Sequence, residues 1–229
     1  MIKAVIFDLD GTIVDFNLDY KSVRAEAIQL LAKQGFPSSM FSTNESIFTM
    51  LKKAKTSMKN YGIGERDITR LKKAVLSVAT RHELEAAHTT NLKPGVVETL
   101  KTLTGMTLKT AIFTVSGEQS TSYILNVFRL KRFFNTIITR ESVSTVKPDP
   151  VHLEAALKAL NVKPDEAIVV GDSQWDMRCA QGLNVIAVGI ATGISSEKDL
   201  MCAGATYLIS SLTDIPALIQ QLNSQVKVV

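Results

Sequence analysis

Two pairs of acidic residues, far apart in the chain, each follow a short apolar run. Asp8 and Asp10 come directly after the first run, and Asp172 and Asp176 follow a later one. Carboxylate oxygens are the ligands that hard divalent cations prefer. Two neighbouring carboxylates can also divide the roles of nucleophile and acid-base catalyst. The same residue types are common in turns and at helix starts, so each pair alone is a weak sign of a catalytic site.

Two further segments, which lie between the acidic pairs, carry side chains that could take part in binding or catalysis. Thr114, Val115 and Ser116 follow another apolar run, where a hydroxyl and backbone amides at a helix start can bind an anion. In a purely structural role, Ser116 would cap the helix that follows it. Lys147 begins the sequence Lys-Pro-Asp-Pro, whose two prolines restrain the backbone that carries the lysine. A single loop lysine is usually a solvated charge, so the order of all four segments carries more weight than any one.

Short apolar runs of strand length alternate with helical patterns along most of the chain. The runs show no polar alternation, which indicates strands buried on both faces of a parallel sheet. Helical patterns follow at residues 95–103, after Ser116 and at residues 151–160. This alternation predicts a doubly wound, Rossmann-like α/β fold, in which the carboxyl ends of the strands form the ligand crevice. The predicted strands cover residues 4–7, 110–113, 136–139, 167–170, 185–188 and 206–209.

The segment of residues 16–90 interrupts this alternation. Its apolar residues recur at helical spacing, with breaks near Gly35 and Gly62, so we expect a helical cap subdomain inserted into an α/β core of residues 1–15 and 91–229. The segment holds 12 basic and 7 acidic residues, a surplus of 5 positive charges that suits an anionic partner. The aromatic fraction is only 6%, and no surface of interleaved basic and aromatic residues is evident, which disfavours nucleic acid.

The composition is that of an ordinary globular protein. Of the 229 residues, 45% are hydrophobic and 21% are charged, which argues against a disordered chain. The longest apolar stretches fall short of the roughly 18 residues that a membrane helix needs, and the N-terminus does not resemble a signal peptide. The two cysteines lack metal-type spacing. We therefore expect a cytoplasmic protein without a membrane partner, as a monomer or weak dimer.

Taken together, the four segments resemble the motifs of the haloacid dehalogenase-like phosphohydrolases. The resemblance is greatest to the branch of phosphoglycolate phosphatases and β-phosphoglucomutases. The sequence Asp8-Leu9-Asp10-Gly11-Thr12 is similar to the first motif and Thr114 to the second. Lys147 within Lys-Pro-Asp-Pro is similar to the third, and Gly171-Asp172-Ser173 with Asp176 to the fourth. The resemblance covers nearly the whole chain, including the helical insertion.

The resemblance implies a role for each residue. Asp8 would be the nucleophile that forms an aspartyl-phosphate. Asp10 would protonate the leaving group and then activate water. Thr114, Val115 and Lys147 would bind the phosphoryl oxygens, and Lys147 would also offset the charge on Asp8. Such positioning and charge neutralisation are what phosphoryl transfer requires.

The resemblance also implies a Mg²⁺ cofactor. Its ligands would be Asp8, Asp172 and the backbone carbonyl of Asp10. Asp176 would contact the ion directly or contact one of these ligands. One departure from the family pattern concerns the second motif, where many relatives have Asn after the threonine. Val115 stands there in this chain, and its side chain cannot hydrogen-bond a substrate. Ser116 is therefore the candidate to replace that contact.

The expected activity is Mg²⁺-dependent hydrolysis of a small phosphorylated metabolite. A phosphomutase of the β-phosphoglucomutase type is the alternative enzyme. A non-catalytic regulatory protein on the same fold is disfavoured because Asp8, Asp10 and Asp172 are all present. A dehalogenase and a phosphonate hydrolase are disfavoured because relatives with those activities lack the second aspartate of the first motif. Phosphoglycolate, sugar phosphates, nucleotides and pyrophosphate are all candidate substrates.

Overall fold

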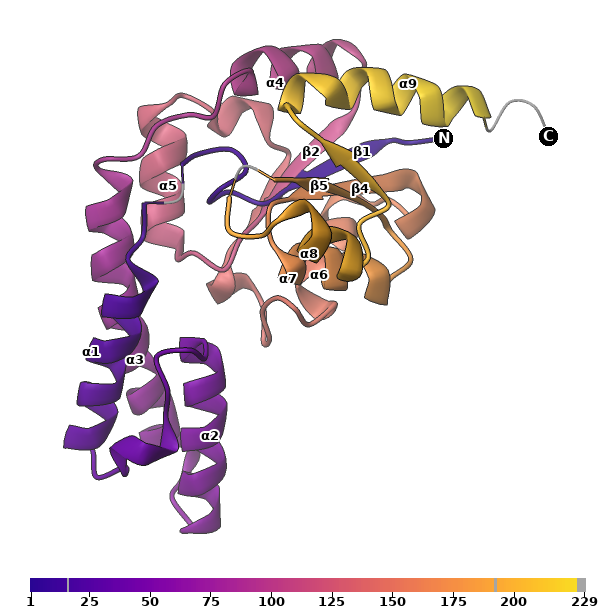
Figure 1. Cartoon of the computed structure of the whole chain (residues 1–229). Coiled ribbons are helices and arrows are strands. Elements are labelled where there is room, and N and C mark those ends of the chain that lie inside the picture. Colours follow the sequence, from indigo (N-terminus) through magenta and orange to yellow (C-terminus); the bar gives the residue numbers. More distant parts are fainter. Residues whose placement is uncertain (16, 192, 226–229) are drawn as a thin grey trace. The chain divides into compact units, whose positions relative to one another are not determined.

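The computed structural model describes residues 1–15, 17–191 and 193–225. The chain divides into two compact units (Figure 1): one comprises Met1–Phe16 and Thr90–Val229, and the other comprises Asn17–Thr89. The predicted first residue of the insertion, Phe16, lies outside the described residues. None of the described helices is both long and apolar enough to span a lipid bilayer.

A sheet of six parallel strands forms the centre of the first unit. The order across the sheet is β3-β2-β1-β4-β5-β6. Each predicted run overlaps one of these strands, and the predicted ends are wrong by two residues at most. The predicted doubly wound α/β fold is thereby confirmed. The strands are β1 (Ala4–Phe7), β2 (Lys109–Phe113), β3 (Thr136–Ile138), β4 (Ala167–Gly171), β5 (Ile186–Ile190) and β6 (Tyr207–Ile209).

Helices cover both faces of this sheet (Figure 1). On one face lie α4 (Val96–Gly105) and α9 (Ile215–Gln225), which pack against each other. On the other face α6 (Val151–Leu160), α7 (Gln174–Gly182) and α8 (Glu197–Cys202) share a buried apolar cluster with the strands. Because helices bury both faces, every residue of β1 and β4 is buried, which explains the absence of polar alternation in these strands.

The second unit contains three α-helices within residues 17–89: α1 (Tyr20–Lys33), α2 (Ile47–Asn60) and α3 (Glu65–Ala87). Their apolar faces form one buried cluster, so the amphipathic spacing in the sequence reflects packing of these helices on one another. The turns after α1 and α2 contain Gly35 and Gly62, which adopt positive φ angles of 92° and 73°. Residues that have a Cβ atom rarely adopt this backbone conformation. The two glycines therefore end the helices where the sequence predicts breaks.

The strand register brings together the segments that carry the candidate catalytic residues. Phe7, the last residue of β1, lies opposite Ile112 of β2 and Val170 of β4. The segments that follow β1, β2 and β4 therefore begin side by side at the carboxyl edge of the sheet. This edge is the ligand crevice of doubly wound folds.

Candidate active site

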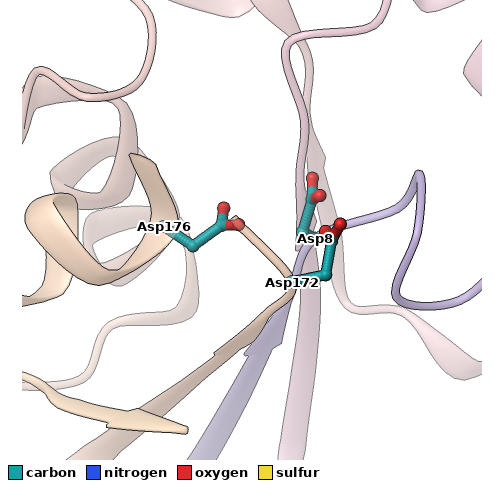
Figure 2. A group of neighbouring side chains, drawn as sticks. All are labelled: Asp8, Asp172 and Asp176. Carbon is teal, nitrogen blue, oxygen red and sulfur yellow. The ribbon is translucent and has the colours of Figure 1, made fainter. Parts of the chain in front are cut away.

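Three buried carboxylates gather at the carboxyl edge of the sheet. Asp8 follows β1, Asp172 follows β4, and Asp176 lies in the first turn of α7 (Figure 2). One carboxylate oxygen from each residue lies within 4.8 Å of the other two. Asp172 and Asp176 have no exposed surface and Asp8 is 7% exposed. Like charges at such distances repel strongly, so this arrangement needs compensating positive charge.

Lys147 supplies one such charge from the loop between β3 and α6. Its Nζ lies 2.6 Å from Asp8 Oδ1 and 2.6 Å from Asp176 Oδ1, and its side chain is 2% exposed. The ammonium also lies 3.8 Å from the centre of the Phe113 ring, a favourable position for a cation. The backbone N–H of Lys147 donates to His152 Nδ1 at 3.3 Å, so the first turn of α6 helps to hold the loop.

The shared environment changes the proton affinities of these groups. Burial lowers the pKa of Lys147, but Asp176 and Asp8 outweigh burial and hold that pKa above its ordinary value. Burial, followed by repulsion from Asp176, raises the pKa of Asp172 to about 6. Burial also raises the pKa of Asp8, and the Lys147 ammonium opposes that rise. The lysine is therefore charged at neutral pH, while the clustered carboxylates would be stabilised by additional positive charge.

A backbone N–H and a threonine hydroxyl hold the carboxylate of Asp172 in place. The N–H of Ile194 donates to Oδ2 at 2.8 Å, and Thr12 Oγ1 donates to Oδ1 at 3.3 Å. Gly193 and Gly11 pass so close that a Cβ atom on either would overlap this carboxylate. Gly11 also has a φ of 84°, which other residues rarely adopt. Glycine is thus required on two sides of Asp172.

Asp176 has protein donors on both carboxylate oxygens. Oδ1 accepts from Lys147, while Oδ2 accepts from the backbone N–H of Ser173 at 3.1 Å and from its Oγ at 2.6 Å. Ser173 in turn caps α7 by accepting from the N–H of Asp176. Sequence reasoning offered both readings, a helix-start acid and a member of an acidic cluster, and the structure contains both.

The segment after β2 places its hydroxyls differently from expectation. In the purely structural reading of the sequence Ser116 caps the next helix, but the cap residue of α5 (Glu118–Val127) is Gly117, so that reading is wrong. The Ser116 hydroxyl donates to Asp10 Oδ2 at 2.6 Å instead. Thr114 is fully buried, and its Oγ1 accepts from the backbone N–H of Ser116 at 3.0 Å. Val115 follows Thr114 in the turn and is half-buried.

The structure thus brings Asp8, Lys147, Asp172 and Asp176 into one buried group. The side chain of Asp10 stands apart from the three clustered carboxylates and reaches the turn after β2. The clustered oxygens are the hard donors that fit a divalent cation such as Mg²⁺. A cation there would also relieve the repulsion among them.

Sequence reasoning missed several residues that support this group. Gly193, Ile194 and His152 carry no motif of their own, and two of them act on Asp172 through the course of the backbone. His152 has no zinc-type spacing to the other histidines, so its residue type favours a packing or surface role and does not indicate the contact with the Lys147 backbone. Backbone donors and space for a carboxylate become visible only once the chain is folded.

Comparison with known proteins places these features in a family. The model of the haloacid dehalogenase-like hydrolases matches residues 5–190. A phosphoglycolate phosphatase of Pseudomonas aeruginosa is 28% identical over 93% of this chain and 78% of its own length. A pyrophosphatase of Halalkalibacterium halodurans is 30% identical over 93% of this chain and 95% of its own.

A solved structure supports the same assignment. A hydrolase from Pseudomonas syringae superimposes with a TM-score of 0.66 and 26% identity, covering 96% of this chain and 98% of that one. The family match covers most of the chain, including the carboxylates and Lys147 at the edge of the sheet. The chain therefore belongs to the haloacid dehalogenase-like hydrolases, and it is a phosphatase of that family.

Proposed function

We propose that this phosphatase is Mg²⁺-dependent and hydrolyses a small phosphorylated metabolite through a phosphoryl group carried on Asp8. The observation that carries the proposal is the pairing of Lys147 Nζ with Asp8 Oδ1 at 2.6 Å inside a group of three buried carboxylates. A buried carboxylate held beside an ammonium is oriented for attack, and its charge is balanced while an anionic substrate approaches.

In the first half-reaction, an Asp8 oxygen attacks phosphorus, and the bond from phosphorus to the leaving-group oxygen breaks. Asp10 gives its proton to that oxygen. Lys147 and the Thr114 hydroxyl donate hydrogen bonds to the phosphoryl oxygens, helped by the backbone N–H of Val115. The Thr114 Oγ1 already accepts from Ser116, which leaves its own proton to be donated.

In the second half-reaction, Asp10 takes a proton from water as the water oxygen attacks phosphorus. The bond between phosphorus and Asp8 breaks, which restores the carboxylate and releases inorganic phosphate. Bound Mg²⁺ would supply positive charge to the phosphoryl oxygens. Asp8, Asp172 and the backbone carbonyl of Asp10 would hold it. Asp176, whose Oδ2 accepts two hydrogen bonds from Ser173, would contact the ion directly or contact one of its ligands.

The helical unit of Asn17–Thr89 would serve as a cap that covers the substrate and selects it. Its surplus of positive charge suits a phosphorylated compound. The names of the relatives favour two substrates for first trial, phosphoglycolate and pyrophosphate. A panel with these two compounds, sugar phosphates and nucleotides would establish which is hydrolysed with the highest kcat/KM. A phosphomutase would instead return the phosphoryl group to the sugar, and product analysis distinguishes that outcome.

The proposal is tested with 4-nitrophenyl phosphate and Mg²⁺, with and without a chelator, in wild type and Asp8→Asn. The wild type is expected to lose activity with the chelator and regain it with added Mg²⁺. Rapid acid quench with labelled substrate should trap label on the wild type but not on Asp8→Asn, because the amide is a poor nucleophile. Turnover by a pure Asp8→Asn preparation at more than a small fraction of the wild-type rate would contradict the covalent mechanism.

A further inference from the structure

The turn after β2 places a serine hydroxyl against the carboxylate assigned to acid-base work. Ser116 Oγ lies 2.6 Å from Asp10 Oδ2, the distance of a strong hydrogen bond to a carboxylate. Ser116 is buried, at 6% exposure, and Asp10 is half-buried. The two residues are 106 positions apart in sequence, so the contact joins the segments after β1 and β2 across the crevice.

The backbone around Ser116 is itself held on two sides. Its N–H donates to Thr114 Oγ1 at 3.0 Å within the turn. Its carbonyl accepts from the N–H of Arg140 at 3.5 Å, and the Arg140 guanidinium reaches the Val115 carbonyl at 3.4 Å. Arg140 is 4% exposed and lies two residues after the end of β3. The serine hydroxyl therefore projects from a turn that is anchored to the neighbouring strand end.

The role proposed for Asp10 depends on the orientation of its carboxyl group. Asp10 lies three residues beyond β1, beside the turn at Gly11, and outside the group that Lys147 and Asp172 build around Asp8. A general acid must lie within hydrogen-bond reach of the oxygen that it protonates. An error of about 1 Å in such a group can cost on the order of 100-fold in rate.

We infer that Ser116 is a positioning residue that holds the Asp10 carboxyl group for proton transfer to the leaving group and from water. This inference rests on the proposed function, in which Asp10 is the acid and base. The serine hydroxyl donates to Oδ2 of Asp10 in both half-reactions, which leaves the other carboxyl oxygen to give a proton to the leaving group and later to take one from water. Ser116 thus acts on the catalytic carboxylate rather than on the substrate.

The test compares two aryl leaving groups of different basicity. Phenyl phosphate needs a proton on its departing oxygen far more than 4-nitrophenyl phosphate does. The measured quantity is kcat/KM, which reports the steps up to departure of the leaving group. For Ser116→Ala we expect a loss of about 10-fold to 100-fold with phenyl phosphate and a much smaller loss with 4-nitrophenyl phosphate. Ser116→Thr, which keeps the hydroxyl, should recover most of the phenyl phosphate activity.

Ser120→Ala is the matched control. It removes another buried serine hydroxyl close by, one that donates to the Gly117 carbonyl at 3.1 Å. We expect it to change kcat/KM by the same factor for both substrates. If Ser116→Ala also lowers both by one factor, the serine has only a structural role in the turn and the inference is wrong.

Circular dichroism establishes that each variant is folded. If Ser116→Ala does not fold, Ser116→Cys, whose thiol is a weak donor, goes through the same comparison with the same expected outcome.

Asp10→Asn separates this inference from the proposed function. With Asp10→Asn we expect an even steeper dependence on the leaving group, and adding Ser116→Ala to that variant should cause little further loss because both changes remove one function. A full additional loss in the double variant would overturn the inference. If Asp10→Asn itself discriminates no more than wild type between the two substrates, the assignment of Asp10 as the acid fails, and the role of Ser116 fails with it.

Discussion

At the scale of single residues, this site is built by close contacts among side chains that would be unstable alone. Lys147 neutralises two carboxylates at once, and its own burial is tolerable only because both are within 2.6 Å. Asp172 depends on a backbone N–H and on two glycines that leave room for its oxygens. Each of these contacts can be removed by one substitution with a defined consequence.

Replacing Lys147 by Met keeps the hydrocarbon length and removes the charge. Asp8 and Asp176 would then be buried without their partner, so we expect the free energy of unfolding to fall by about 3–5 kcal/mol. Loss of a charged donor to the phosphoryl group should also lower kcat on the order of 10²–10³-fold. Urea denaturation and steady-state kinetics measure the two effects. Lys158→Met, which breaks only the surface ion pair with Glu154, is the control and should change both quantities far less.

Replacing Gly193 by Ala should weaken metal binding. The added Cβ would overlap the Asp172 carboxylate, so either that carboxylate or the Ile194 backbone must move. We expect the dissociation constant for Mg²⁺ to rise about 10-fold to 100-fold, the range found when groups that orient a metal ligand are lost. Calorimetry, or the fluorescence of Trp175, the one tryptophan in the sequence, measures binding without turnover.

Gly105→Ala is the control for this change, because a Cβ there meets no atom within 4 Å. It should bind Mg²⁺ as wild type does. An unaltered dissociation constant in folded Gly193→Ala would show that the loop after β5 adapts without disturbing Asp172.

At the scale of elements, α6 connects the lysine loop to the core through His152. This histidine has no exposed surface, its Nδ1 accepts from the Lys147 N–H, and its ring packs edge-on against Phe113. Burial, followed by repulsion from the Lys147 charge, lowers the pKa of His152 to about 3, although the Ile138 carbonyl opposes the shift. A neutral imidazole is therefore part of the folded core.

This histidine makes stability depend on pH. The unfolded chain has a histidine pKa near 6.5. Between about pH 6.5 and pH 3 the unfolded chain therefore binds a proton that the folded chain does not. Stability contributed by the neutral imidazole is present above this window and is lost as the pH falls through it, by up to about 1.4 kcal/mol per pH unit.

His152→Gln keeps a polar side chain and removes the titration. Between pH 7 and pH 5 we expect wild type to lose about 2 kcal/mol more unfolding free energy than this variant, because other groups titrate alike in both. Urea denaturation at the two pH values gives the difference. Equal losses in the two proteins would mean that His152 is protonated in the folded state at pH 5.

At the scale of the whole molecule, the proposed catalytic residues all belong to the unit of Met1–Phe16 and Thr90–Val229. The other unit has an apolar cluster of its own. The chain leaves and re-enters the α/β unit at adjacent points, where Asp15 N–H donates to the Asn91 carbonyl and Thr90 Oγ1 donates to the Asp15 carbonyl, both at 2.9 Å. A short linker could therefore join these points at little entropic cost.

Replacing residues 16–89 by a short Gly/Ser linker tests the division of labour between the units. We expect slow Mg²⁺-dependent hydrolysis of 4-nitrophenyl phosphate to survive, and most of the preference among natural metabolites to disappear, because a lid excludes water and contacts the substrate. Circular dichroism and size-exclusion chromatography establish that the shortened protein is folded and soluble. If it ranked the metabolites as the full chain does, selectivity would have to reside in the α/β unit.

The sequence by itself determined the strand positions, the parallel α/β class and the segments that reach the site. Apolar runs such as residues 4–7 and 167–170 could be read because burial on both faces leaves no polar alternation. The clustering of Asp8 with Asp172 also followed, since carboxyl ends of parallel strands share one edge. Tertiary structure alone decided that Ser116 contacts Asp10 and that Ile194 and Gly193 surround Asp172. These contacts join residues that are 22 to 106 positions apart in sequence, or they depend on backbone atoms and on the space left by glycine. Such contacts cannot be recognised from the types of residues that are neighbours in sequence.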